Sequence, residues 1–196
     1  MSTSFKNVTP TGPGGTATLL IVLSFTGFLL LTQSLFVVPS GQVAVVTTLG
    51  KVTKNSRSAG LNVKIPFVQS VYPFDIKTQV QPEKFETLTK DLQVIKATAT
   101  IKYAIKPKKA PTIFRTIANR NSDIYQKIVY PSLLKALKSV FSQYELETIA
   151  TDFNVISEKV AESVAKELKS FDLVDVQSLD LTGLEIAEEY RAAIEQ

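Results

Sequence analysis

An uncharged apolar stretch near the N-terminus constrains this chain more than any other feature of its sequence. No charged residue lies between Lys6 and Lys51, and within that interval residues 17–38 read ATLLIVLSFTGFLLLTQSLFVV. As a helix, this stretch would be about 33 Å long, which matches a bilayer hydrocarbon core of about 30 Å. The sequence therefore predicts a transmembrane helix at 17–38, anchored by Ala17, Leu19, Leu20, Ile21, Val22, Phe25, Phe28, Leu29, Leu30, Leu31, Leu35 and Phe36.

Two alternatives fit this stretch less well. A cleaved signal peptide has a short apolar core, a charged start and a small-residue cleavage site, whereas here the run is long and Val38-Pro39 is a poor cleavage site. A buried core helix seldom runs this long without a charge. The glycines and proline at 12–15 predict that residues 1–16 form a disordered tail.

The residue types that are missing exclude several kinds of chemistry. The 196 residues include no Cys, His or Trp, so disulfides, thiolate nucleophiles, imidazole metal ligands and His-dependent triads are excluded. No phosphate-binding loop is present, and paired carboxylates such as Glu145 and Glu147 fall on expected helix surfaces. Asp75 is best explained as an ion-pair or strand-edge residue. We expect no enzymatic activity, no cofactor and no metal.

Charge is distributed unevenly along the chain. Residues 39–109 carry 12 basic and 4 acidic residues, a net +8, and residues 110–196 carry 9 and 14, a net −5; with Lys6 these sum to +4. This pattern indicates a polarised molecule rather than a nucleic-acid binder, and the acidic part of one copy is expected to meet the basic part of the next. The candidates for contact with anionic lipid headgroups are Lys51, Lys54, Arg57 and Lys64.

Residues 39–184 predict one α+β domain, with an antiparallel sheet-rich first part and a helical second part. The clearest strand is Leu92–Ile105, where apolar and polar residues alternate strictly, and shorter strands are expected at 42–49, 61–65, 71–76 and 173–181. Helices are expected from Pro111, from Asn121 or Ser122 across Pro131, and from a Thr151 cap. Residues 185–196 predict an amphipathic helix with the stripe Ile186, Tyr190 and Ile194, which needs a partner surface or a continuation.

Several short motifs occur in an ordered series. Gly60-Leu61 is followed by 65–69 (IPFVQ) and 74–77 (FDIK), then by 90–93 (KDLQ), 131–132 (PS), 137–140 (LKSV), 171–173 (FDL) and 189–190 (EY). In order and spacing the series resembles the prohibitin branch of the SPFH, or band 7, family, and the resemblance covers Val38 to Gln196. Two positions depart from the family pattern: Lys77 stands where Arg is usual, and Asn154 where a capping Glu is common.

The resemblance implies a membrane-anchored scaffold that assembles with itself, or with a paralogue, into a large ring or cage. It also implies that residues 185–196 start a coiled-coil arm, with Ile186, Tyr190 and Ile194 as the interface between copies. Such an assembly would organise a membrane patch and modulate an AAA+ membrane protease of the FtsH type, without binding nucleic acid. It also implies a single-pass protein of a bacterial plasma, thylakoid or mitochondrial inner membrane, with the domain on the non-cytoplasmic side. The lysines after the anchor weakly favour the opposite orientation. A monomeric lipid-binding membrane module is the alternative.

Overall fold

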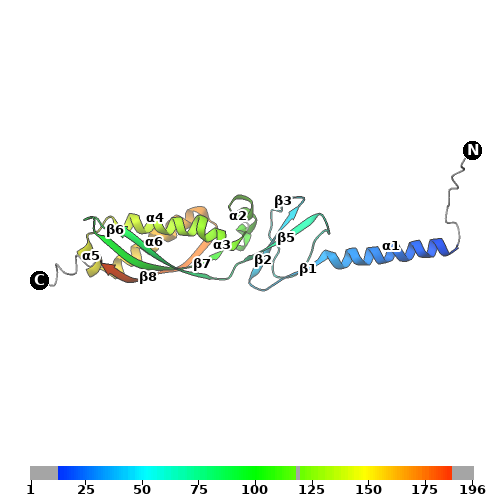
Figure 1. The fold of residues 1–196 in the computed structure, drawn as a ribbon, viewed down its shortest axis with the longest axis horizontal. Coiled ribbons are helices and arrows are strands. Elements are labelled where there is room, and N and C mark those ends of the chain that lie inside the picture. Colours follow the sequence, from blue (N-terminus) through cyan, green and yellow to red (C-terminus); the bar gives the residue numbers. More distant parts are fainter. Residues whose placement is uncertain (1–12, 118–119, 187–196) are drawn as a thin grey trace, which may run out of the picture.

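The computed structural model describes residues 13–117 and 120–186, which form an elongated molecule with helix α1 at one end (Figure 1). In chain order the elements are α1 (Pro13–Ser34), β1 (Leu35–Val38), β2 (Gln42–Thr48), β3 (Lys51–Val52), β4 (Gly60–Val63), β5 (Gln69–Asp75), β6 (Gln79–Leu88), β7 (Val94–Ile105), the 3-10 turn η1 (Pro107–Lys109), α2 (Ala110–Thr116), α3 (Asn121–Ile124), the π-helical turn η2 (Tyr125–Val129), α4 (Tyr130–Phe141), α5 (Leu146–Thr151), α6 (Phe153–Phe171) and β8 (Val174–Ile186).

The strands form three antiparallel sheets in succession away from α1. A two-stranded ribbon joins β1 to β4, the second sheet has the order β3-β2-β5, and the third has the order β6-β7-β8. One continuous core links the second and third sheets to the helices, because it includes Val45 and Phe74 as well as Ile101 and Leu137, all fully buried. The sheet-rich first part and the helical second part therefore form a single α+β unit, as the sequence predicts.

Strand β7 shows how directly the alternation of residues determines its two faces. Ile95, Ala97, Ala99, Ile101, Tyr103 and Ile105 are all buried, whereas Lys96 is exposed and Thr98, Thr100 and Lys102 are partly exposed. Pairing with β6 on one side and β8 on the other makes β7 the centre of its sheet. Pro73 likewise lies in β5 at a sheet edge, the position where a missing backbone N–H is tolerated.

The helices agree with the expected pattern in their faces but differ at their ends. The stripe of α6 is buried at Ile156, Val160, Val164 and Leu168. Pro131 lies where two helical segments abut, in the first turn of α4 and directly after the π-helical turn η2. Neither expected cap is observed: Thr151 ends α5, and no side-chain cap begins α3 or α6.

The helix predicted at 17–38 ends four residues earlier in the structure, and residues 13–16 of the expected disordered tail belong to the helix. The helix begins at Pro13, since proline suits the first helical turn. It ends at Ser34, so that Leu35 and Phe36, predicted as anchor residues, lie in β1. Leu35–Val38 pairs in register with Gly60–Val63. A continuous apolar run does not distinguish a helix from a strand, and here the available partner strand decides. Residues 1–12 of the expected disordered tail lie outside the described residues.

The predicted start of a coiled-coil helix at residue 185 is also wrong. Glu185 and Ile186 belong to β8, where they pair with Lys96 and Ile95. Gly183, with φ of +62°, lies at a register shift where two residues of β8, Gly183 and Leu184, lie opposite one residue of β7, Ala97. Such a bulge bends a strand without ending it, so the glycine does not terminate β8. Residues 187–196 lie outside the described residues.

Candidate functional site

The most distinctive region is the end of the domain that receives α1. Ser34 closes the helix and Leu35 opens β1, so no linker separates the two elements. The backbone N–H of Lys64, just after β4, donates a 2.7 Å hydrogen bond to the carbonyl oxygen of Ser34. Since β4 also pairs along the whole of β1, the end of the helix is held by the domain from two sides.

Helix α1 is the one helix among the described residues that is long and apolar enough to span a bilayer, judged by length and composition. The spanning window is Ala17–Ser34, none of which is buried by the rest of the chain. The predicted anchor residues from Ala17 to Leu31 therefore all lie on this helix. Two threonines inside it donate their hydroxyls to helix carbonyls, Thr26 to Val22 and Thr32 to Leu29, which spares them an unpaired hydroxyl in an apolar medium.

The four predicted headgroup residues lie at different distances from this end. Lys64 adjoins Ser34, and Lys51 begins β3 next to the Leu49-Gly50 turn. Arg57 instead bridges Ala44, which is four residues along β2 from Thr48 and thus about 13 Å further from the anchor. Lys54 lies on the exposed loop between them. Of the four predicted headgroup residues, Lys51 and Lys64 therefore lie at the end of the domain next to α1.

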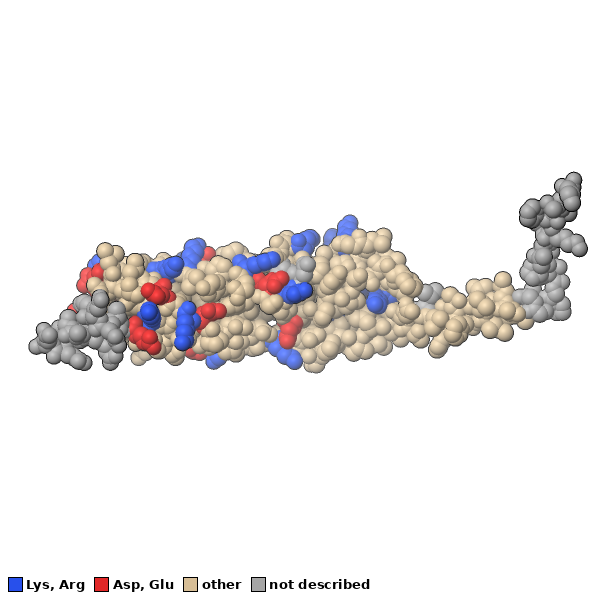
Figure 2. Space-filling view, viewed as in Figure 1, with Lys and Arg blue, Asp and Glu red and all other residues tan. Residues whose placement is uncertain are grey.

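Some of the opposite charges meet within the chain. Lys90, Lys102, Lys106 and Lys109, all from the basic half, form ion pairs with Glu145, Asp180, Asp172 and Asp175 from the acidic half. No ion pair among the described residues involves Lys51, Lys54, Arg57 or Lys64. On the face shown in Figure 2, acidic side chains cover only the part of the domain distant from α1, while basic side chains extend toward it. The first 74 residues contain no Asp or Glu at all.

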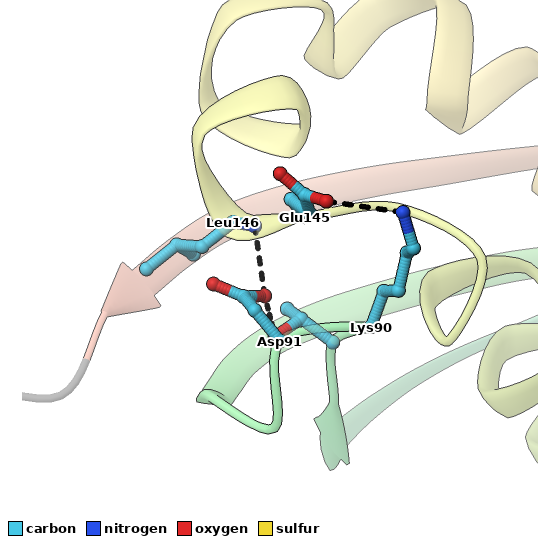
Figure 3. Close-up of polar contacts among 5 residues, drawn as sticks. Lys90, Asp91, Glu145 and Leu146 are labelled. Carbon is cyan, nitrogen blue, oxygen red and sulfur yellow. Dashed lines mark hydrogen bonds and ion pairs between the residues drawn. The ribbon is translucent and has the colours of Figure 1, made fainter.

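The KDLQ corner is a structural clasp (Figure 3). Asp91 accepts a 2.6 Å hydrogen bond from the Thr89 hydroxyl and a 3.2 Å hydrogen bond from the backbone N–H of Leu146, the first residue of α5. Lys90 pairs with Glu145 at 3.0 Å. The Thr89 hydroxyl, followed by the backbone N–H groups, lowers the pKa of the Asp91 carboxyl. The corner thus caps a helix that has no side-chain cap of its own.

A second charged cluster lies at the C-terminal end of α6. Asp172 accepts hydrogen bonds from Lys106 at 2.7 Å and lies 2.6 Å from Lys109, and Lys106 also pairs with Asp175 at 3.3 Å. These two lysines lower the pKa of the Asp172 carboxyl to about 2, and the two carboxylates raise the pKa of Lys106. All four groups are satisfied by one another, which is typical of a structural cluster.

The cavities of the described residues contain no catalytic arrangement. A cavity of about 710 Å³ lies between the ends of β6 and β7 and the exposed side of α4, and it is lined by Leu88, Val94 and Lys138 among others. A smaller polar cavity of about 350 Å³ is lined by Glu83, Tyr103 and Tyr125. Burial, followed by the nearby Glu83, raises the pKa of Tyr125.

The Asp75 carboxylate accepts a 2.8 Å hydrogen bond from the backbone N–H of Lys77 and forms no ion pair within the described residues. No three acidic residues gather as a metal site within the described part.

Two functional candidates were missed by sequence reasoning. Leu49 and Phe67 are exposed apolar residues at neighbouring loop tips, with 83% and 86% of their surface accessible. Both have positive φ, +48° and +63°. The only signal in the sequence was Leu-Gly at a position where a tight hairpin turn favours Asn-Gly. Of the predicted oligomer interface, Ile186 lies in β8, and Tyr190 and Ile194 lie outside the described residues.

Comparison with known proteins decides the family. Residues 36–196 match the model of the SPFH domain / Band 7 family. The chain belongs to the SPFH domain / Band 7 family. Its curated relatives include prohibitins. The chain is 30% identical to Prohibitin-3, mitochondrial, of Arabidopsis thaliana over 85% of this chain and 27% identical to Prohibitin-1 of Schizosaccharomyces pombe over 87% of it. It is 27% identical to Prohibitin-2 of Gallus gallus over the whole of this chain.

The expected family and its prohibitin branch are thus confirmed. The chain spans 59% of the length of the Arabidopsis and Schizosaccharomyces proteins and 66% of the Gallus protein. Within the SPFH domain the motif residues have physical roles. KDLQ forms the clasp on α5, and Pro131 opens α4. Phe171-Asp172-Leu173 ends α6 with the left-handed residue Asp172 and leads into β8.

Proposed function

We propose that this SPFH chain is the subunit of a membrane-anchored scaffold, which assembles side by side into a large ring or cage and organises the membrane patch that it encloses. The observation that carries the proposal is the direct junction of α1 with the domain, because the Ser34–Lys64 hydrogen bond and the β1–β4 ribbon hold the domain at the end of an apolar helix. An SPFH domain fixed in this way stands on the membrane surface. The prohibitin relatives support a membrane scaffold role.

Modulation of an AAA+ membrane protease of the FtsH type, and assembly with a paralogue, are finer parts of the proposal that rest on the resemblance to prohibitins. Assembly through opposite charges has less support, since four lysines of the basic half, Lys90, Lys102, Lys106 and Lys109, already pair with carboxylates within the chain. The apolar stripe at Tyr190 and Ile194 is the better candidate for the contact between copies. Tyr190 and Ile194 are spaced four residues apart, as on one face of a helix, and this amphipathic spacing in the sequence supports the choice.

Particle size in a mild detergent tests the scaffold. We expect the full chain to run as a megadalton-scale particle on native gels and in electron micrographs. Replacing Tyr190 and Ile194 with Asp should dissociate it while circular dichroism stays unchanged. Glu189→Gln, off the stripe, serves as the control. Ile186 is unsuitable for this test, because it pairs with Ile95 in β8 and its replacement would perturb the fold. A monomer peak for the unaltered chain would instead support the monomeric lipid-binding module.

The side of the membrane is a separate part of the proposal: we infer that the domain lies on the non-cytoplasmic side. The absence of cysteine allows a single one to be introduced. Asn55→Cys is suitable because Asn55 is exposed, whereas the neighbouring Ser56 hydroxyl donates to the Pro107 carbonyl oxygen. In intact cells or mitoplasts an impermeant maleimide should label this cysteine from outside. Labelling that appears only after lysis would place the domain on the opposite side.

A further inference from the structure

Four exposed apolar residues gather where α1 enters the domain, and we call them the apolar foot: Leu35, Leu49, Val63 and Phe67. Leu35 and Val63 face each other across the β1–β4 ribbon. The Ser34–Lys64 hydrogen bond brings the following loop to the end of α1, and Phe67 is at the tip of that loop. Leu49 donates its backbone N–H to the Val68 carbonyl oxygen at 2.9 Å, which holds its turn beside that tip.

The local backbone keeps Phe67 at the surface. The Val68 N–H donates to the Pro66 carbonyl oxygen at 2.8 Å, which closes a γ-turn of the rarer form with positive φ at its central residue, Phe67. The Gln69 side chain stabilises the loop: its oxygen accepts from the Ile65 N–H at 2.9 Å, and its amide donates to the Thr48 hydroxyl at 3.1 Å. Gln69 thereby joins this loop to the end of β2. With 86% of its surface accessible, Phe67 gains almost no packing inside the domain.

Leu49 is equally unexpected at its position. It forms the β2–β3 hairpin turn with Gly50, and both residues have positive φ, as a two-residue type I′ turn requires. Asparagine favours the first position of such a turn, whereas leucine is strained there by its side chain. A strained and exposed leucine adds nothing to the stability of the domain in water. Its side chain is accounted for if a partner outside the domain covers it.

The electrostatic surroundings identify that partner. Lys51 follows Leu49 by two residues and Lys64 precedes Phe67 by three, and neither forms an ion pair within the described residues. No carboxylate occurs in residues 1–74. Apolar residues flanked by lysines are typical of segments that lie in the boundary between lipid headgroups and acyl chains. The foot also adjoins a helix long enough to span a bilayer, so the lipid surface is the nearest apolar phase.

We propose that the apolar foot dips into the headgroup boundary of the bilayer and forms a second membrane contact beside α1. This inference rests on the membrane anchoring proposed above and deepens it. Two tips inserted next to the helix would give the domain a second point of attachment to the membrane, so that each subunit would present a fixed face to its neighbours. A second copy of the chain, or another protein, is the competing occupant of the foot.

The absence of tryptophan provides a direct test. The full chain, carrying either Phe67→Trp or Leu49→Trp, is reconstituted into vesicles of phosphatidylcholine and phosphatidylglycerol, some containing lipids brominated along the acyl chain. Leu92→Trp is the matched control, because Leu92 is 76% accessible, has φ of +61° and lies at the hairpin corner far from α1. Phe25→Trp, inside α1, reports on the anchor itself.

We expect the tryptophans of Phe67→Trp and Leu49→Trp to emit at shorter wavelength in vesicles than in detergent-free buffer with denaturant. Brominated lipid should quench their emission several-fold more than that of Leu92→Trp. Bromines near the headgroup should quench more than bromines near the chain end. Quenching of Phe25→Trp without quenching of Phe67→Trp and Leu49→Trp would contradict membrane contact by the apolar foot, while still supporting α1 as the anchor. Blue-shifted emission that bromine does not quench would show that a protein covers the foot. Loss of quenching at Phe25 would instead contradict the anchored scaffold.

Discussion

Asp172 is the residue whose charge is most strongly controlled by its neighbours. It ends α6 in a left-handed conformation with φ of +54°, and Lys106 and Lys109 lower its pKa to about 2 from an ordinary value of 3.8. A carboxylate with a lowered pKa in the folded state stabilises the fold above the unfolded-state pKa, and this contribution is lost as pH falls through the folded-state value. The stabilisation should therefore be complete above about pH 5 and should vanish near pH 2.

Asp172→Asn tests this linkage, because asparagine also adopts the left-handed conformation and removes only the charge. We expect the melting temperature of the variant to lie below that of the unaltered chain by a constant amount between pH 5 and pH 8. The difference should shrink steadily between pH 4 and pH 2. Glu158→Gln, at an exposed position of α6 without an ion pair in the described residues, should show no such pH dependence. A difference that stays constant down to pH 2 would contradict the lowered pKa.

Leu49 allows strain to be separated from membrane contact. Because asparagine suits the first position of the type I′ turn, Leu49→Asn should raise the free energy of unfolding by about 0.5–1 kcal/mol in mild detergent. Urea titration followed by circular dichroism measures the change. Val80→Asn, at an exposed residue in the regular strand β6, should not stabilise the chain. If Leu49→Asn lowered the stability instead, the leucine would be supporting the fold, and the argument for an external partner would lose its basis.

At the scale of elements, β7 gives the most direct link between sequence and stability. Ile101 is fully buried at the centre of β7 between β6 and β8, where it contributes to the core that includes the helices. Ile101→Ala should lower the free energy of unfolding by about 2–4 kcal/mol, through lost apolar contact and the cavity that remains. Thr100→Ala, on the opposite face of the strand, should cost less than about 1 kcal/mol. Equal losses for the two variants in urea titrations would contradict the assignment of the buried face.

The same contrast explains which elements the sequence predicts. The strict alternation of β7 and the spaced stripe of α6 each match one periodicity, so both faces were predicted correctly. Strand β6 was missed because Pro82 and polar residues interrupt its pattern, and its pairing with β7 makes it a strand. Strand β1 was taken for helix because every residue in Leu35–Val38 is apolar. In both elements a partner strand distant in sequence decides the structure.

In the candidate site, too, local features were predicted from the sequence and features that depend on distant contacts were not. A long uncharged run is a local property, so an apolar helix long enough to span a bilayer was predicted from the sequence, although its C-terminal limit was wrong. The four headgroup residues were chosen by their proximity in sequence, which could not show that Arg57 bridges Ala44, away from the anchor end. Leu49 and Phe67 were missed because their importance depends on positive φ, exposure and a shared position beside Ser34. None of these properties has a reliable signature in a single sequence.

At the scale of the whole molecule, the uneven charge is partly neutralised within the chain and partly left free at the anchor end. If Lys51 and Lys64 contact anionic headgroups, each contributes about 1 kcal/mol, so neutralising both should weaken the retention of anionic lipid by roughly thirtyfold at low salt. The measurement is the amount of phosphatidylglycerol that co-purifies with the full chain carrying Lys51→Gln and Lys64→Gln. High salt should reduce the difference.

Lys96→Gln is the matched control for this experiment, because Lys96 is an exposed lysine on the solvent-facing side of β7, in the sheet furthest from α1. Its neutralisation should leave the co-purified lipid unchanged. If Lys96→Gln reduced the amount of co-purified lipid as much as the double variant does, the chain would attract anionic lipid through its net charge rather than through Lys51 and Lys64.

The direct junction of α1 and β1 at Ser34 and Leu35 couples the orientation of the helix to that of the domain. A transmembrane helix tilts when its apolar length exceeds the thickness of the surrounding bilayer. Because the β1–β4 ribbon and the Ser34–Lys64 hydrogen bond leave no slack after the helix, a tilt of α1 must be carried into the domain. In an elongated domain (Figure 1), a small rotation at the membrane becomes a larger displacement at the opposite end, where α5 and the hairpin corner lie. Local bilayer thickness would thereby be converted into a movement far above the lipid surface.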